Sequence, residues 1–191
     1  RLPVPDGAAV GCFCESDAVY DSFDDGDFAR HAEGSGCVYD NRTQRNAIRK
    51  IKVKHDGEYL CFLLRTKQPV TPYDGTGSWM RLYLNTTGGQ GYQFVLNTHP
   101  APDGTTTLAR VTGTDDDLTA ADLPDVAAFY EVDGDKFKIK VPLRALGLDP
   151  DGFTVWFKAA DSREPIASVE DFYDKGDVAP LGRMNFVYRG K

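Results

Sequence analysis

Residues 79–97, WMRLYLNTTGGQGYQFVLN, decide the fold that the sequence predicts. On both sides of a central turn, apolar and polar residues alternate with a period of two, which is typical of strands with one buried face. The connection at 86–91 contains three glycines, and glycine accepts the positive φ angles of a tight or bulged turn. The stretch therefore predicts a β-hairpin with its apolar face in a core.

The opposite face of this hairpin indicates a ligand-binding surface. Strand alternation predicts that Trp79, Arg81 and Tyr83 point the same way. Aromatic rings beside planar hydrogen-bonding groups are unusual on a solvated sheet face, where charged aliphatic side chains are the norm. The alternative is that a loop or a second sheet covers Trp79 and Tyr83.

Length and composition favour one all-β domain. A chain of 191 residues buries enough surface to fold without disulfides, and its 19 glycines and 11 prolines suit many short strands joined by turns. We expect a single domain over residues 1–191, a two-sheet antiparallel, jelly-roll-like β-sandwich with one or two short helical turns, and residues 1–9 as a linker or lead-in. The predicted core consists of Leu60, Phe62, Leu64, Leu82, Leu84, Phe94, Leu96, Phe137, Ile139, Val155 and Phe157.

Other segments extend this layout. Residues 59–66, YLCFLLRT, are apolar on both faces, which predicts a central strand. A strand is expected over 105–112, a hairpin over 129–141, a helical turn over 142–147 ending at Gly147, and an edge strand with Cys12 and Cys14 over 10–20. Residues 171–182 read as irregular, and 184–189 as the strand that closes the sheet.

The charge of the chain limits its partners. A net charge of −7 and a pI near 4.9 disfavour nucleic acid and anionic membranes, because both require a basic surface. No apolar run reaches the roughly 18 to 20 residues of a membrane span. We find no signal peptide, and because the chain starts at Arg1 we expect it to be a piece of a longer protein.

An acidic loop is the weak metal candidate. Asp21, Asp24, Asp25 and Asp27 surround Gly26, and calcium prefers oxygen ligands gathered on a loop. The alternative is a solvated acidic turn, since the spacing differs from the helix-loop-helix calcium pattern. The four cysteines allow three disulfide connectivities between which the spacing does not choose.

Catalytic patterns are weak in this sequence. The least accidental carboxylates are Asp161, Glu164, Asp171 and Asp177, near loops where a glycosidase would place an acid and its partner. The alternative is structural: Asp177 caps a turn and pairs with Arg183. We expect no enzyme activity.

Five segments in order carry a resemblance to a known family. They are 45–66 (RNAIRKIKVKHDGEYLCFLLRT), SWMRLYLNT with GYQFVLN within 78–97, 141–148 (VPLRALGL), 153–162 (FTVWFKAADS) and 171–188 (DFYDKGDVAPLGRMNFVY). This succession resembles bacterial domains related to carbohydrate-binding module family 9 and the wider DOMON-like group. The resemblance implies two packed antiparallel sheets, attachment to larger secreted polysaccharide-active proteins, sugar binding between tryptophans, and in many members structural calcium.

The sequence thus predicts a non-catalytic carbohydrate-binding module of a secreted or cell-surface protein. The expected ligand-binding residues are Tyr73, Trp79, Arg81, Tyr83, Asp161, Arg163, Asp177 and Arg183. Aromatic faces would stack on sugar C–H groups while the polar side chains bind hydroxyls. One alternative is a structural or spacer domain that packs against a catalytic neighbour in the same chain, and a third is a glycoside-active enzyme that uses loop carboxylates.

Overall fold

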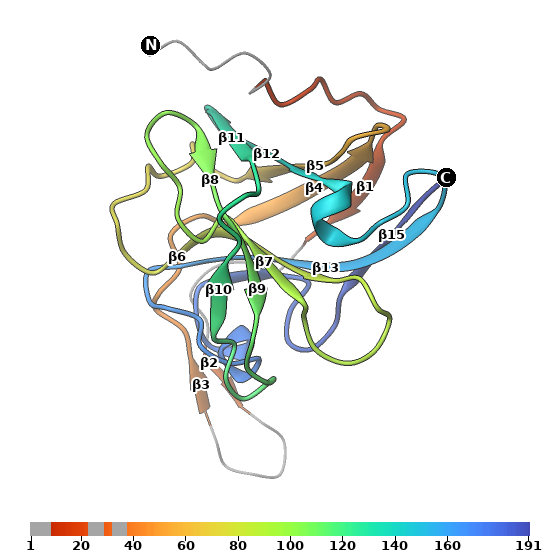
Figure 1. Cartoon of the computed structure of the whole chain (residues 1–191). Coiled ribbons are helices and arrows are strands. Elements are labelled where there is room, and N and C mark those ends of the chain that lie inside the picture. Colours follow the sequence, from red (N-terminus) through yellow and green to blue (C-terminus); the bar gives the residue numbers. More distant parts are fainter. Residues whose placement is uncertain (1–8, 23–28, 32–37) are drawn as a thin grey trace.

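The computed structural model describes residues 9–22, 29–31 and 38–191 and shows two antiparallel β-sheets packed face to face (Figure 1). The predicted all-β sandwich is therefore confirmed. The two helical segments in the described part of the chain are single 3-10 turns, so none of its helices is long and apolar enough to cross a membrane.

The first sheet has six strands in the order β1-β4-β5-β12-β11-β8. Its strands are β1 (Ala18–Asp21), β4 (Ile48–His55), β5 (Tyr59–Thr66), β8 (Thr105–Thr106), β11 (Ala128–Asp133) and β12 (Lys136–Pro142). The doubly apolar β5 occupies a central position, as its sequence predicts, because both of its faces are covered.

The second sheet has seven strands, in the order β10-β9-β7-β6-β13-β14, with β15 also paired to β13. Its strands are β6 (Ser78–Asn85), β7 (Phe94–Leu96), β9 (Leu108–Val111), β10 (Ala120–Asp122), β13 (Phe153–Ser162), β14 (Asp177–Ala179) and β15 (Phe186–Gly190). A separate pair joins β2 (Ala29–His31) to β3 (Val38–Asp40). The 3-10 helices are η1 (Leu143–Leu146) and η2 (Glu170–Tyr173).

The main core lies between the two sheets. All eleven predicted core residues are buried there. The hairpin of β6 and β7 pairs Leu82 with Leu96 and Leu84 with Phe94, as the alternation of its sequence predicts. Removal of this apolar surface from water is the main free-energy gain of folding.

Several boundaries differ from the sequence prediction. The expected strand at 105–112 is divided, because β8 belongs to the first sheet and β9 to the second. The expected edge strand at 10–20 is confined to β1, and Cys12 and Cys14 precede it in an exposed segment. The expected helical turn is η1, which ends at Gly147 with φ 69°.

A second, smaller core covers part of the outer face of the second sheet. Tyr83 of β6 and Val178 of β14 pack there against Phe172 of η2. Residues 171–182, predicted to be irregular, thus contain most of η2 and all of β14, with irregular backbone between and after them. They fold because Phe172 anchors the segment on the sheet.

Candidate functional site

A β-bulge in β6 places Trp79 inside the molecule. The pairs Arg81 with Ala160 and Ser78 with Ser162 leave two residues of β6 opposite one residue of β13. Met80 adopts φ 45° at this point, and as a result Trp79 and Met80 both belong to the main core. The prediction that Trp79 shares a face with Arg81 and Tyr83 is therefore wrong, because the bulge interrupts the alternation that the prediction assumed.

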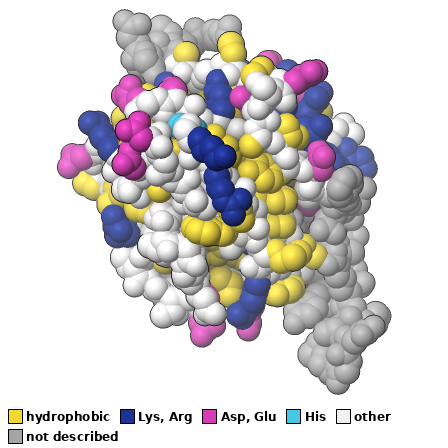
Figure 2. Space-filling view, turned by 90° about the vertical axis from the view of Figure 1, so that its right-hand side faces the viewer, with side chains coloured by type: hydrophobic (Ala, Val, Ile, Leu, Met, Phe, Trp, Pro, Cys, Tyr) yellow, Lys and Arg dark blue, Asp and Glu magenta, His cyan; other side chains and the backbone are white. Residues whose placement is uncertain are grey.

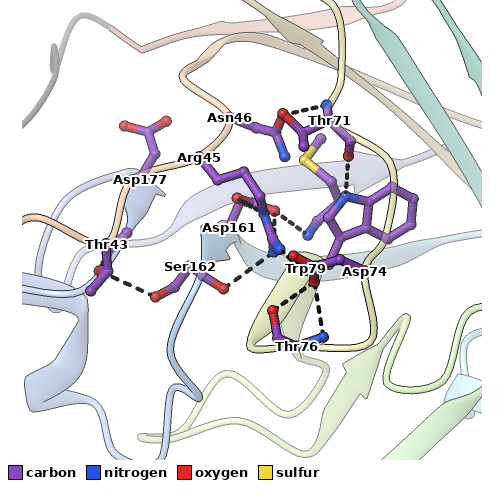
Figure 3. A network of polar contacts seen from close by, with 12 residues as sticks. Thr43, Arg45, Asn46, Thr71, Asp74, Thr76, Trp79, Asp161, Ser162 and Asp177 are labelled. Carbon is purple, nitrogen blue, oxygen red and sulfur yellow. Dashed lines mark hydrogen bonds and ion pairs between the residues drawn. The ribbon is translucent and has the colours of Figure 1, made fainter.

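A buried ion pair holds the bulge. Arg45 donates from Nε to Asp161 Oδ2 at 3.1 Å and from Nη2 to Asp161 Oδ1 at 3.2 Å, and both side chains are fully buried (Figure 3). Asp161 Oδ1 also accepts the backbone N–H of Met80 at 3.0 Å. Burial raises the pKa of the Asp161 carboxyl, and the Arg45 guanidinium opposes that shift. Asp161 is thus a structural residue below the surface, where no ligand reaches its carboxylate.

Arg45 also connects the bulge to the loop between β5 and β6. Its Nη1 donates to the exposed carboxylate of Asp74 at 3.3 Å, and Asp74 accepts both the N–H and the hydroxyl of Thr76 (Figure 3). The indole N–H of Trp79 donates to the carbonyl of Thr71 at 2.7 Å. This loop is therefore fixed from two sides, which keeps the residues at its surface in place.

Asp177 has a structural environment as well. Its carboxylate accepts the N–H of Ile48 and the side-chain amide of Gln44 at 2.9 Å, in place of the predicted pair with Arg183. Burial raises the pKa of Asp177 to about 7, although these hydrogen bonds oppose the shift. Arg183 lies at the surface, where it lines a hollow of about 270 Å³ with Asp115 and Asn185.

One hollow of the described surface is lined by aromatic rings and prolines and is called here the aromatic hollow. It has a volume of about 500 Å³. Its lining consists of Val70, Pro72, Tyr73, Trp79, Pro100, Pro102, Asp103, Gly104, Tyr130, Glu131 and Val132. Two predicted ligand-binding residues, Tyr73 and Trp79, come together here with ring centroids 5.6 Å apart.

The rings of the aromatic hollow are held by internal bonds and contacts. Tyr130 donates its hydroxyl to the carbonyl of Ala101 at 2.7 Å, and its ring lies edge-on to Trp79 at 5.6 Å. Trp79 is only 2 % exposed, whereas Tyr73 and Tyr130 are half-buried. A ligand in the hollow would therefore meet mainly the two tyrosine rings, with Trp79 as the floor that supports them.

Two carboxylates stand at the aromatic hollow. Asp103 accepts the N–H and the hydroxyl of Thr105, which hold the pKa of its carboxyl below the usual value. Glu131 lies 3.8 Å from the ammonium of Lys138. An ionised carboxylate is a strong acceptor, so both groups can accept hydrogen bonds from hydroxyl groups of a ligand.

The other predicted ligand-binding residues lie elsewhere. Arg81 and Tyr83 are on the outer face of the second sheet, where Tyr83 is 1 % exposed under the segment that contains η2. Arg163 is exposed on the loop after β13 and donates its backbone N–H to the carbonyl of Thr43. The structure therefore distributes the predicted site over several places: it brings Tyr73 and Trp79 together in the aromatic hollow, and Arg81 and Tyr83 together on the outer face of the second sheet.

Most of the acidic loop that the sequence offered as a weak calcium candidate lies outside the described residues. Asp24, Asp25 and Asp27 lie outside them, and the Asp21 carboxylate is 3.6 Å from the ammonium of Lys50. Within 9–22, 29–31 and 38–191 no group of three or more potential metal ligands gathers. Of the cysteines, Cys61 is a free buried thiol, and Cys37 lies outside the described residues.

The loop carboxylates considered for catalysis are engaged in the fold. Asp171 accepts the N–H groups of Ala167 and Ser168 and pairs with Lys175 at 3.0 Å. Asp161 and Asp177 are buried as described above. Only Glu164 of this set is exposed, so the arrangement gives no pair of carboxylates that face a common substrate position.

Sequence reasoning missed most of the aromatic hollow. Tyr130 and Glu131 come from β11, and Pro100 and Pro102 from the loop before β8. These residues are far from Trp79 in the chain and become its neighbours only when the two sheets pack. The one available signal was the pair of prolines near the hairpin, since proline favours rigid loop surfaces.

The fold and this hollow define the class of protein: an all-β sandwich with an aromatic surface depression at one edge of its core. No protein-family model, no curated protein and no solved structure matches the chain.

Proposed function

We propose that the chain is a non-catalytic carbohydrate-binding module that binds a sugar unit in the aromatic hollow. The observation that carries the proposal is the convergence of Tyr73 and Tyr130 over Trp79 beside two carboxylates. Sugars present apolar C–H faces and hydroxyl edges. Aromatic rings bind the former, and carboxylates such as Asp103 and Glu131 bind the latter.

The volume of the aromatic hollow and the net charge of the chain support a neutral ligand of this kind. A volume of about 500 Å³ lies within the usual range of small-ligand sites. The net charge of −7 and the two carboxylates at the hollow disfavour an anionic ligand there. The resemblance to carbohydrate-binding module family 9 points to the same ligand class and to a larger secreted or cell-surface polysaccharide-active protein.

A glycan array and affinity electrophoresis test the proposal. The isolated chain is screened against neutral and acidic glycans, and the bound glycan is then tested with Tyr73→Ala and Glu131→Gln. We expect Tyr73→Ala to weaken binding about fivefold or more, because a stacked ring contributes on the order of 1 kcal/mol. The control is Tyr59→Ala, a half-buried tyrosine outside the hollow. Unchanged binding by folded Tyr73→Ala would place the sugar elsewhere.

A second candidate function has its own observation. Figure 2 views the side that carries β1, β15 and the C-terminus, and hydrophobic side chains gather in the middle of this face, crossed by Lys and Arg. Such a face suits a spacer domain that packs against a catalytic neighbour. A folded chain that binds nothing on the array would favour this function.

A further inference from the structure

Arg81 carries a positive charge that pairs with no carboxylate among the described residues. Its guanidinium lies close to the Tyr83 hydroxyl and acts on it electrostatically, but its Nε is buried without a hydrogen-bond acceptor among these residues. A buried N–H group normally has a partner, because leaving it unpaired costs about 1 to 3 kcal/mol and more for a charged group. A missing acceptor at Arg81 therefore points to a ligand.

Tyr83, two residues further along the same face of β6, carries a second buried polar group of this kind. Its hydroxyl is buried close to Ser78 and Arg81, but no hydrogen bond of good geometry satisfies it. Its ring is fixed by edge-on contacts with Phe172 at 5.0 Å and Tyr92 at 5.7 Å. Burial raises the pKa of the phenol, so the hydroxyl remains protonated and is a hydrogen-bond donor.

Both groups line one small hollow on the outer face of the second sheet, called here the Arg81 hollow, with a volume of about 140 Å³. The other lining residues are Val95, Thr98, His99, Leu118, Ala120, Asp122 and Ile166. No residue of this hollow belongs to the aromatic hollow. The two sites can therefore be tested separately.

The carboxylates close to the Arg81 hollow are bound to other groups. Asp122 accepts the hydroxyl of Thr98 at 2.8 Å and lies 2.6 Å from Nδ1 of His99. Asp171 interacts with Tyr83 only through its charge, since its oxygens are bound to neighbouring N–H groups and to Lys175. These carboxylates therefore do not neutralise Arg81, and its buried Nε is available to an external acceptor.

We propose that the Arg81 hollow binds the carboxylate group of a small organic acid. A carboxylate oxygen accepts from both the Arg81 guanidinium and the Tyr83 hydroxyl, and these charge-assisted bonds satisfy both buried donors. A monoanion fits better than phosphate, because a single guanidinium faces the hollow and Asp122 would repel further negative charge. The volume equals roughly four to five water molecules, which limits the acid to a few heavy atoms.

The test measures the melting temperature of the chain with sodium acetate as the probe, against sodium chloride at equal ionic strength. A ligand that binds only the folded state raises the melting temperature. We expect acetate to raise it in a saturable way and acetamide, which has the same shape without charge, to have no effect. Isothermal titration calorimetry gives the acetate Kd.

Two variants connect this effect to the hollow. Tyr83→Phe removes one donor and keeps the packed ring, and because no hydrogen bond of good geometry satisfies the hydroxyl we expect its melting temperature without acetate to be little changed. Its acetate Kd should rise about tenfold or more, as should that of Arg81→Gln. The control is Arg144→Gln, which removes an exposed arginine of η1 outside the hollow and should bind acetate as the wild type does.

Four results would overturn the proposal. They are equal shifts with acetate and chloride, equal shifts with acetate and acetamide, stronger binding of phosphate than of acetate, and unchanged acetate binding in Tyr83→Phe. If Arg81→Gln does not fold, Tyr83→Phe alone decides. Loss of glycan binding in Tyr73→Ala leaves this test unaffected, because Tyr73 lies in the other hollow.

Discussion

The carboxylate of Asp161 accepts the backbone N–H of Met80 at 3.0 Å while it binds Arg45. These bonds hold the β-bulge that directs the Trp79 side chain into the core. A bulge leaves a backbone N–H without a strand partner, and a buried N–H must be satisfied. Asp161 supplies the acceptor, and Arg45 supplies the charge that makes the buried carboxylate tolerable. The floor of the aromatic hollow therefore depends on a pair of residues that lies outside it.

We expect Asp161→Ala to lower the free energy of unfolding by about 3 to 5 kcal/mol, because it leaves the buried guanidinium of Arg45 with the carbonyl of Ser162 and with Asp74, an exposed carboxylate, as its only remaining ionic partner among the described residues. Urea denaturation followed by fluorescence measures the change. The matched control is Asp74→Ala, at the other end of the same guanidinium, which should cost clearly less because an exposed ion pair contributes little to stability. Equal costs for both variants would contradict the structural role of Asp161.

We expect Trp79→Ala to lower the free energy of unfolding by about 3 to 5 kcal/mol, because the ring is buried against Phe137 and Tyr130. Tyr73→Ala, at the half-buried edge of the same hollow, should cost clearly less. Thermal unfolding by circular dichroism compares the two. A stable Trp79→Ala variant would show that the ring is not part of the core.

Gly176→Ala should be strongly destabilising, by more than about 2 kcal/mol, because a Cβ at this position would lie 2.0 Å from the carbonyl oxygen of Asp161, on a residue with φ 63°. Gly134→Ala is the control, since its φ of 58° is similar and no atom lies within 4 Å of its Cβ position. It should cost only the conformational strain, about 1 to 2 kcal/mol. Chemical denaturation of both variants separates the backbone strain from the steric clash. Similar losses in the free energy of unfolding would argue against a clash between the added Cβ and the carbonyl of Asp161.

Asp177 should make stability depend on pH below neutrality. Its carboxyl has a pKa of about 7 in the folded chain against 3.8 as the ordinary value, so the folded state binds the proton more tightly. The resulting stabilisation is complete below about pH 3.8 and is lost as the pH rises through about 7. In Asp177→Asn the free energy of unfolding should lack this decline. Parallel slopes of the two proteins between pH 4 and 7 would contradict the raised pKa.

Lys158 should make the free energy of unfolding increase as the pH rises above neutrality. Burial lowers the pKa of its ammonium from 10.5 to about 7, and its Nζ donates to the carbonyl of Pro180. Because the folded pKa is depressed, the stabilisation is complete above about pH 10.5 and is lost as the pH falls through about 7. Between pH 7 and 10 the free energy of unfolding of the wild type should thus increase relative to that of Lys158→Met, as measured by denaturation at each pH. A difference in the free energy of unfolding between the two proteins that stays constant with pH would show that the pKa of Lys158 is not lowered.

The sequence by itself determined the class of fold. The alternation in 79–97 placed Leu82, Leu84 and Phe94 in the core, and the doubly apolar run at 59–66 identified the central strand β5. Such patterns are local, since the period of side chains along a strand fixes which residues share a face. For the same reason the turn at Gly147 could be predicted, because a positive φ there requires glycine.

Only the tertiary structure decided where Trp79 points and which residues surround it. The bulge depends on Asp161 of another strand, and a one-residue change in pairing reverses the faces of the residues before it. Tyr130 reaches the aromatic hollow, and Asp122 the Arg81 hollow, from strands distant in sequence. Burial and the satisfaction of buried donors are properties of the whole packed chain, so no local pattern of residues records them.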